Sequence, residues 1–266
     1  MAGASLQLSD IQVIRSGRTI LNIDSLNIAA GQFVNIIGTN GAGKTILLKV
    51  MCGLLKPTRG FVAFNGIAIL SQTPWRRSNL RKQIGYIPQA AEYNPELPFT
   101  VREVVAMGRT SVRPLLVSLN HDDYDYVDQW LDKVGLGNQR NQTFRSLSGG
   151  EQQKALIARA MVQNPKVLML DEPTSNLDFH WKLKISHFVR ELQSQMNLTV
   201  LMISHEIASI PLSADRTILL DGGKIIADGN SEEVLTSNII QNVYRCRMRV
   251  FEEEGRRYIV NQEIAG

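Results

Sequence analysis

Apolar and polar residues alternate over residues 6–28, and this period of two predicts antiparallel strands with one buried face. A continuous apolar run follows at Phe33–Ile37, as expected for a strand buried on both faces. Gly60–Leu70 returns to a strand pattern around a turn at Asn65-Gly66. Between these segments, Lys44–Leu54 is predicted to be a helix that ends near Gly53.

The pattern changes between Gln89 and Leu147, where helical spacing replaces strand spacing. Beyond this insert, helices alternate with buried strands, which implies a mostly parallel sheet, and two hairpins follow. The predicted helices are Val101–Met107, Asp122–Val134, Glu151–Val162 and Trp181–Gln195, and the predicted buried strands are Val167–Leu170 and Thr199–Ile203. The hairpins pair Ile218–Leu220 with Lys224–Ala227, and Met248–Phe251 with Arg257–Val260.

Composition narrows the class of protein but not its function. The 266 residues are 44% hydrophobic and 20% charged, as in an ordinary globular protein, and the formal net charge is +4. No apolar run approaches the ~18–20 residues needed to span a bilayer, and no secretory signal is expected. Cys52 and Cys246 fit no metal-ligand spacing and are expected to be reduced thiols.

The segment Gly38–Thr45 fits the pattern G-x-x-x-x-G-K-[ST] between a predicted strand and a predicted helix, the context of a phosphate-binding loop. Its glycines let backbone N–H groups turn toward phosphate oxygens at a positive helix end. Lys44 is placed to reach the β- and γ-phosphates, and the Thr45 hydroxyl to ligate Mg²⁺. The candidate contacts are Gly38, Thr39, Asn40, Gly41, Ala42, Gly43, Lys44, Thr45 and Ile46. Alone, the loop predicts only nucleoside triphosphate binding.

Two acids, Asp171 and Glu172, end the apolar strand at Val167–Leu170. The carboxyl edge of an α/β sheet is where ligands bind, so Asp171 suits the Mg²⁺ shell. Glu172 is then placed to orient an attacking water or accept its proton. Separately, Leu147-Ser148-Gly149-Gly150-Glu151 precedes a helix, with Ser148 at the N-cap. This is a second anion site or, read alone, simply a capped helix start.

Together these segments resemble the nucleotide-binding subunits of the ABC (ATP-binding cassette) family, over nearly the whole chain. The resemblance implies an α/β fold: a P-loop NTPase core with a mixed, mostly parallel sheet, an N-terminal antiparallel β-subdomain and a helical sub-domain. Six motifs occur in family order: Gly38–Thr45 (Walker A), Gln89 (Q-loop), Leu147–Glu151 (signature), Asp171-Glu172 (Walker B), Ser175–Asp178 (D-loop) and His205 (switch histidine). The implied boundaries are a core at 1–88 and 151–240, a helical sub-domain at 89–150 and a C-terminal hairpin at 241–266.

The resemblance also implies roles for residues. ATP and Mg²⁺ are the implied cofactors, and the enzyme is an ATPase whose copies form a head-to-tail homodimer. Ser148 and Gly150 of one copy would complete the γ-phosphate site of the other, with Gly149 and Asp178 also at the nucleotide. The implied catalytic residues are Glu172, His205 and Gln89, and the implied metal ligands are Thr45, Gln89 and Asp171.

Three positions depart from the family pattern. Ile46 stands where a second hydroxyl would be expected near the α-phosphate, which would cost about 0.5–1.5 kcal/mol of nucleotide binding. No aromatic residue lies near Arg15 to stack on adenine. The Arg15 guanidinium could stack in its place, and a solvated loop arginine is the equal alternative. Glu151 replaces the commoner glutamine, a variant found in uptake-type members.

The stretch Phe99–Arg109 resembles ATPases that energise import of iron–siderophore complexes, haem or cobalamin. This branch implies two permease subunits and, indirectly, a substrate-binding protein, with the chain at the cytoplasmic face of the bacterial inner membrane and no nucleic-acid partner. Pro98, Phe99 and Arg109 are candidate permease contacts, with loop packing as the alternative. Zinc or manganese importers and a soluble iron–sulfur assembly ATPase are the remaining alternatives.

Overall fold

A six-stranded sheet forms the centre of the computed structural model, which describes residues 3–89, 98–114, 116–204, 214–245, 248–253 and 256–261. All neighbouring strands in it run parallel except the edge pair β9 and β10, which is antiparallel. Its order is β10 (Lys224–Gly229), β9 (Arg216–Asp221), β3 (Phe33–Gly38), β8 (Thr199–Ile203), β7 (Val167–Leu170) and β6 (Ile84–Ile87). Strands β3, β7 and β8 are buried along their whole length, as their continuous apolar runs predict.

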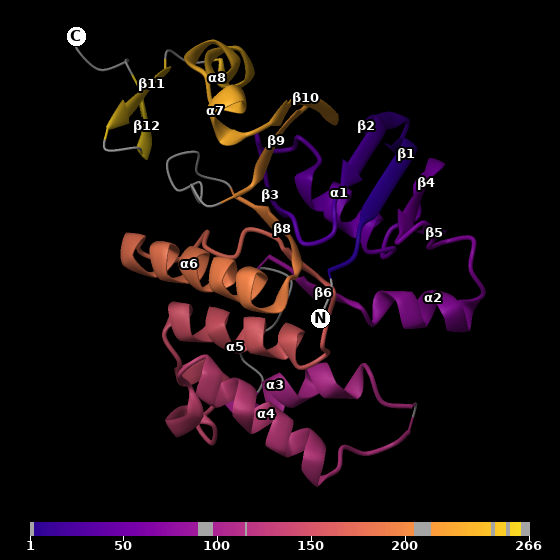
Figure 1. Cartoon of the computed structure of the whole chain (residues 1–266), viewed down its shortest axis with the longest axis vertical. Coiled ribbons are helices and arrows are strands. Elements are labelled where there is room, and N and C mark those ends of the chain that lie inside the picture. Colours follow the sequence, from indigo (N-terminus) through magenta and orange to yellow (C-terminus); the bar gives the residue numbers. More distant parts are fainter. Residues whose placement is uncertain are drawn as a thin grey trace.

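A second sheet is antiparallel and lies on the other side of helix α1 (Lys44–Met51), as Figure 1 shows. Its order is β2 (Arg18–Ile28), β1 (Leu6–Arg15), β4 (Arg59–Phe64) and β5 (Ile67–Ala68). The alternating apolar residues of β1 and β2 face α1 and share one hydrophobic cluster with it. Burying α1 between two sheets fixes the helix that carries the phosphate loop.

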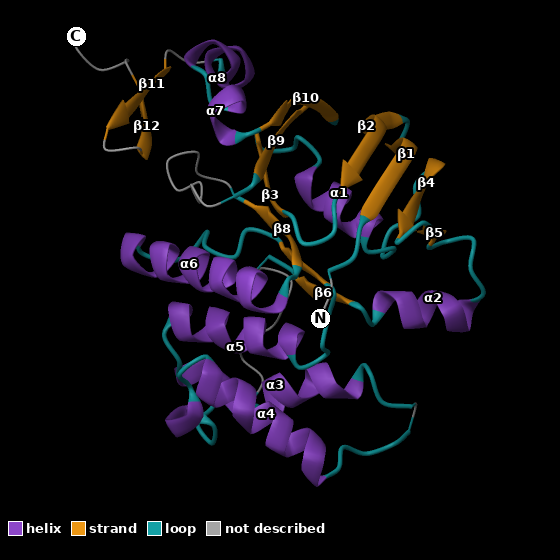
Figure 2. Ribbon diagram, in the orientation of Figure 1, coloured by secondary structure: helices purple, strands orange, loops and turns teal. Residues whose placement is uncertain are grey.

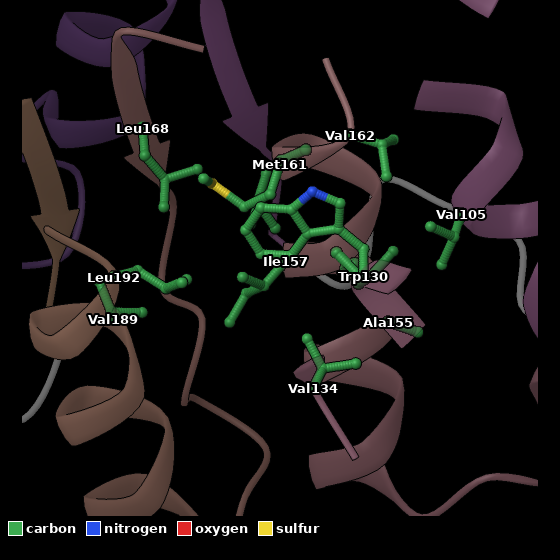
Figure 3. Packing of buried hydrophobic residues seen from close by; sticks show 14 of the residues in the cluster. Val105, Trp130, Val134, Ala155, Ile157, Met161, Val162, Leu168, Val189 and Leu192 are labelled. Carbon is green, nitrogen blue, oxygen red and sulfur yellow. The ribbon is translucent and has the colours of Figure 1, made fainter. Parts of the chain in front are cut away.

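The opposite side of the central sheet is covered by helices (Figure 2). Helices α5 (Gly149–Met161) and α6 (Phe179–Met196) lie next to the sheet, and α3 (Val101–Thr110) and α4 (His121–Lys133) pack on the far side of α5, with 3₁₀ turns at Gly137–Gln139 and Phe144–Ser146. One hydrophobic cluster runs from α3 and α4 through α5 to β7 and β8. Figure 3 shows the ring of Trp130 in this cluster, among Ile157 and Met161 of α5.

Asp123, at the start of α4, is a buried carboxylate that ties the helical region together. Arg109 and Arg113 both form ion pairs with it, and its carboxylate also accepts from the backbone N–H of Asn120 in a capping box. Burial alone would raise the pKa of Asp123, but these hydrogen bonds and charges lower it to about 2. Arg109 also donates to the carbonyl of Val162, so its guanidinium is occupied within the fold.

The fold class predicted from the sequence is confirmed: a mixed, mostly parallel sheet, an antiparallel β-subdomain and a helical region. Four elements had no counterpart in the sequence prediction: α2 (Pro74–Arg81), β6, α7 (Ser231–Val234) and α8 (Ser237–Tyr244). Each is short, and α2 buries none of its residues, so it leaves no apolar periodicity to read. The last hairpin pairs β11 (Met248–Glu253) with β12 (Arg256–Asn261). Within the described ranges, no helix is long and apolar enough to cross a membrane.

Candidate functional site

The phosphate loop connects the carboxyl end of β3 to the first residue of α1. Gly38 has a φ of 152°, and a Cβ there would collide with the carbonyl oxygen of Leu220 on β9. Gly43 is the N-cap of α1, has a φ of 96° and supplies no side-chain cap. The first N–H groups of α1 are therefore oriented toward a ligand rather than toward a capping side chain, as an anion site requires.

Lys44 is buried beneath this loop, with only 5% of its surface exposed. Its Nζ donates to the carbonyl oxygens of Gly38 and Thr39 at 2.9 and 3.0 Å. Burial lowers the pKa of Lys44, while the negative charges of Glu172 and Asp171 act in the opposite direction. The Nζ of Lys44 already lies inside the loop. When phosphate binds, it can therefore exchange its carbonyl hydrogen bonds for hydrogen bonds to phosphate oxygens without first entering solvent.

Asp171 lies directly after β7 and is fully buried. The Thr45 hydroxyl donates to its Oδ1 at 3.0 Å, and the Tyr86 hydroxyl donates to its Oδ2 at 3.2 Å. A hydroxyl and a carboxylate oxygen in contact, with a second carboxylate nearby, form the hard oxygen donor set that Mg²⁺ prefers. These residues fit the metal that the sequence implied, with Tyr86 orienting the carboxylate.

Glu172, one residue further, has a left-handed backbone with φ of 50°, unusual for a residue with a long side chain. Such backbone strain clusters at functional sites. Gln89 donates from its Nε2 to Oε2 of Glu172 at 2.9 Å. The Q-loop residue predicted from the sequence thus lies against the predicted catalytic carboxylate, although the two are distant in the chain.

A cavity of about 730 Å³ opens over these groups. Of the predicted site residues, it is lined by the phosphate loop, Gln89 and Glu172. Its full lining is Ile20, Asn40, Gly41, Ala42, Gly43, Lys44, Thr45, Ile46, Gln89, Glu172, Thr174, Ser175 and Lys182. Arg15 is exposed at the end of the β1–β2 hairpin and is not among the lining residues. Its stacking on adenine stays a prediction.

The signature segment forms the N-terminus of α5, and its residues do not line this cavity. Ser148 is the N-cap, as predicted, in a full capping box with Glu151. The Ser148 hydroxyl and backbone N–H donate to Oε2 of Glu151 at 2.7 and 2.9 Å. Those hydrogen bonds from Ser148 lower the pKa of Glu151.

Gly150 is packed against the ring of Trp181 from α6, so closely that a Cβ at Gly150 would overlap the indole. Lys154 and Lys184 lie over the same ring, 5.5 and 5.1 Å from its centroid. Asp178 caps α6 by accepting from the backbone N–H of Trp181 at 2.9 Å. The D-loop and the signature therefore meet at one residue, Trp181, through its backbone N–H and its ring respectively. His205 lies outside the described residues.

Sequence reasoning missed several residues of the site. Tyr86 is not among the site residues predicted from the sequence, because its contact with Asp171 depends on β6 pairing with β7. Ile20 and Lys182 line the cavity from β2 and α6. Neither belongs to a motif, and no sequence signal marks them. The position of Trp181 just after the D-loop could have suggested a place near the site. Its contact with Gly150 could not be predicted, because it depends on tertiary packing.

Comparison with known proteins gives matches across most of the chain. The petrobactin import ATP-binding protein of Bacillus anthracis is 32% identical over 91% of this chain and 87% of its own length. The hemin import ATP-binding protein of Rhizobium meliloti is 34% identical, covering 92% and 93%. The zinc uptake ATP-binding protein of Bacillus subtilis is 36% identical, covering 82% and 92%.

Solved structures give the same result. A dimeric bacterial ABC transporter cassette, MJ0796, aligns with a TM-score of 0.74 and 27% identity, covering 85% of this chain and 98% of its own. The protein cbiO1 of Clostridium perfringens, part of the ABC transporter complex cbiONQ, aligns with a TM-score of 0.76 and 28% identity, covering 89% of this chain and 92% of its own. The ABC transporter family model matches residues 21–175. The chain therefore belongs to the ABC transporter family and is one of its ATP-binding, ATP-hydrolysing subunits.

Proposed function

We propose that this chain powers uptake of a metal chelate of the iron–siderophore, haem or cobalamin type. Two copies would lie head-to-tail on two permease subunits at the cytoplasmic face of the bacterial inner membrane. A substrate-binding protein would deliver the cargo from the other side. The observation that carries the catalytic part is the pairing of Gln89 with Glu172, beside the phosphate loop and Asp171.

The residues divide the hydrolytic chemistry among them. The N–H groups of the loop and Lys44 hold the phosphates, and Thr45, Asp171 and Gln89 would hold Mg²⁺. When bound, Mg²⁺ supplies positive charge to the phosphate oxygens. Glu172 accepts the proton of the attacking water, or orients that water, because its carboxylate lies beyond the loop and is held by Gln89. Tyr86 keeps Asp171 in the orientation that Thr45 requires.

A second copy of the chain completes the site in this proposal. Ser148, Gly149 and Gly150 do not line the cavity formed by the phosphate loop of their own chain. They lie at a helix N-terminus, which suits phosphate, so their ligand would be the ATP held by another copy. The relative MJ0796 has been solved as a dimer, which supports this arrangement.

A hollow of about 320 Å³ is a candidate site for contact with the permease. It lies where the carboxyl ends of α1 and α3 approach α2 and β6. Its lining is Cys52, Leu54, Ser78, Arg81, Lys82, Ile84, Tyr86, Ser111 and Gln163. We infer that a permease helix enters here. Arg109, suggested from the sequence, is held by Asp123 and Val162 and is replaced in this role by Arg81 and Lys82.

The kind of cargo rests on the relatives alone. The petrobactin and hemin import proteins match over nearly the whole chain, which favours a metal chelate. The zinc uptake relative is at least as similar in identity over a shorter span, so a zinc importer is the second candidate. Identifying the permease that co-purifies with the chain from detergent-solubilised membranes separates the two. Co-purification with soluble partners only would support an iron–sulfur assembly ATPase instead.

The catalytic proposal is tested by Glu172→Gln. Removing the carboxylate removes the proton acceptor but keeps the shape and the contact with Gln89, so hydrolysis should fall about 10²–10⁴-fold. ATP binding should be unchanged, and an ATP-bound dimer should accumulate in gel filtration. Hydrolysis near the wild-type rate would exclude Glu172 as the proton acceptor. Asp122→Asn, which removes an exposed carboxylate on α4 outside the nucleotide cavity, is the matched control.

A further inference from the structure

Positive charge is concentrated in one part of the sequence. Residues 25–91 contain no Asp or Glu, whereas the chain as a whole carries 25 of them. The cations of this segment are Lys44, Lys49, Lys56, Arg59, Arg76, Arg77, Arg81 and Lys82. Because the net charge of the whole chain is only +4, the remainder of the chain is net negative. Half of these cations lie in or next to α2.

Helix α2 lies on the surface of the molecule. None of its residues is buried, and Leu80 is its member that packs on the core. Trp75 is 73% exposed, a large apolar surface to leave in water. Figure 1 shows the chain entering α2 at its outer end and returning from its inner end to β6. Trp75, Arg76 and Arg77, here named the α2 tip, therefore lie at the outer end.

The α2 tip carries positive charge at the N-terminus of its helix, where positive charge is unfavourable. The first turn of α2 contains no acidic residue, and Thr73 makes no side-chain cap. Arg76 and Arg77 lie beside a positive helix end, where cations are unfavourable. In contrast, α3, α4 and α5 begin with capping boxes closed by acidic residues. In the described part of the chain no ion pair neutralises Arg76 or Arg77, so an anion from outside would meet both charges and the helix end.

We propose that the α2 tip binds the anionic phospholipid headgroups of the membrane that holds the permease. This inference rests on the proposed function, which brings the chain to that membrane. The inner end of α2 lines the hollow assigned to the permease, so the outer end extends past that contact along the same helix. Trp75 suits the interface, because an indole has an apolar ring and a polar N–H.

Position distinguishes lipid from permease as the partner of the tip, because the hollow assigned to the permease is lined by the inner end of α2 and by none of Trp75, Arg76 and Arg77. The cytoplasmic leaflet is anionic and attracts basic segments, each cation near the surface adding about fivefold in affinity. The attraction acts within a Debye length, about 8 Å at physiological salt, so it requires cations at the surface, as here.

The test is flotation of the full chain with vesicles of phosphatidylcholine, with and without phosphatidylglycerol. Wild-type protein should bind the phosphatidylglycerol vesicles and lose binding as salt is added. The Arg76→Glu/Arg77→Glu variant should bind at least about tenfold more weakly, and Trp75→Ala a few-fold more weakly. Lys133→Glu/Lys224→Glu, the same charge change at exposed positions of α4 and β10, should bind nearly as the wild type.

Three outcomes would overturn the proposal: equal binding to neutral vesicles, equal loss in the control variant, or tighter retention on a DNA oligonucleotide than on anionic vesicles at the same salt. If the Arg76→Glu/Arg77→Glu variant lost permease co-purification but kept vesicle binding, the tip would be a protein contact. ATP hydrolysis should be unchanged in it, since α2 lines no part of the nucleotide cavity. Failure of hydrolysis in the wild type would count against the proposed function and leave the vesicle result standing.

Discussion

The N-termini of α1 and α5 would both meet phosphate in the proposed ATPase, yet they are built in opposite ways. At α1, Gly43 offers no side-chain cap and Lys44 is buried behind the loop. At α5, Ser148 and Glu151 cap the helix with each other, and the Ser148 hydroxyl already donates to a carboxylate. The α1 terminus therefore has no side-chain cap, whereas at the α5 terminus the Ser148 hydroxyl and the Glu151 N–H are already paired.

The difference indicates which terminus binds ATP first. The loop at α1 can bind phosphate in a single chain, because the helix end has no side-chain cap and Lys44 can exchange its carbonyl contacts for phosphate oxygens. At α5, the Ser148 hydroxyl can donate to phosphate only if it turns away from Glu151. We therefore expect a single chain to bind ATP well and to hydrolyse it poorly until a second copy supplies α5.

Among substitutions at these two helix ends, Gly150→Ala should cause the largest loss of ATP hydrolysis. The new Cβ would overlap the Trp181 ring and push the start of α5 out of place. A displacement of about 1 Å at a reacting group costs about 10²-fold in rate, so hydrolysis should fall by that order. ATP binding by the single chain should persist, because α1 is untouched. Steady-state hydrolysis and equilibrium nucleotide binding measure the two effects.

A second substitution separates crowding from a direct role of Gly150. In Gly150→Ala/Trp181→Ala the ring is gone, so hydrolysis should recover above the Gly150→Ala level. Trp181→Ala alone removes the packing and two cation–π contacts and should lower hydrolysis less than Gly150→Ala. A double variant as inactive as Gly150→Ala would show that the overlap with Trp181 is not the cause.

A smaller effect is expected at α1 itself, from Ile46→Thr. Ile46 lines the nucleotide cavity at the position where a second hydroxyl could donate to phosphate. One added hydrogen bond contributes about 0.5–1.5 kcal/mol, or roughly two- to tenfold in ATP affinity. Calorimetric titration in the Glu172→Gln background measures it without turnover. Ile46→Val serves as the control, and equal affinities of the Thr and Val variants would contradict the expectation.

The smallest effect should come from Glu151→Gln, which weakens the α5 cap without removing it. Because hydrogen bonds from Ser148 lower the pKa of Glu151, the carboxylate stabilises the fold above the ordinary glutamate pKa. That stabilisation is lost as pH falls through the lowered pKa of the folded state. At neutral pH the variant should be less stable by about 0.5 kcal/mol, with the difference vanishing in acid. Melting temperatures across pH measure this, and a pH-independent difference would contradict it.

The parts that could be predicted from the sequence are those fixed by local spacing. Ser148 and Glu151 are three residues apart, and a capping box follows from that spacing alone. Gly38–Thr45 and Asp171-Glu172 each follow an apolar strand, and parallel strands bring their carboxyl ends to one edge. The fold class followed from the same patterns. The left-handed backbone of Glu172 gave no sequence signal.

The parts that could not be predicted depend on tertiary contacts or on the absence of periodicity. Helix α2 has no buried residue, so it has no apolar face to detect. Gly150 and Trp181 are brought together by the packing of α5 on α6, and neither is part of a pattern that spans both. The ion pair between Arg109 and Asp123 depends on how α3 packs on α4. The sequence gives no sign of this ion pair, so Arg109 is predicted from the sequence as a candidate permease contact.

The side chain of Tyr86 has two neighbourhoods at once. Its hydroxyl donates to Asp171, and the residue also lines the hollow assigned to the permease. A single side chain, that of Tyr86, therefore connects the hollow to Asp171. A permease helix in the hollow would contact the side chain that holds Asp171, so docking and the proposed metal ligand would be linked through one hydrogen bond.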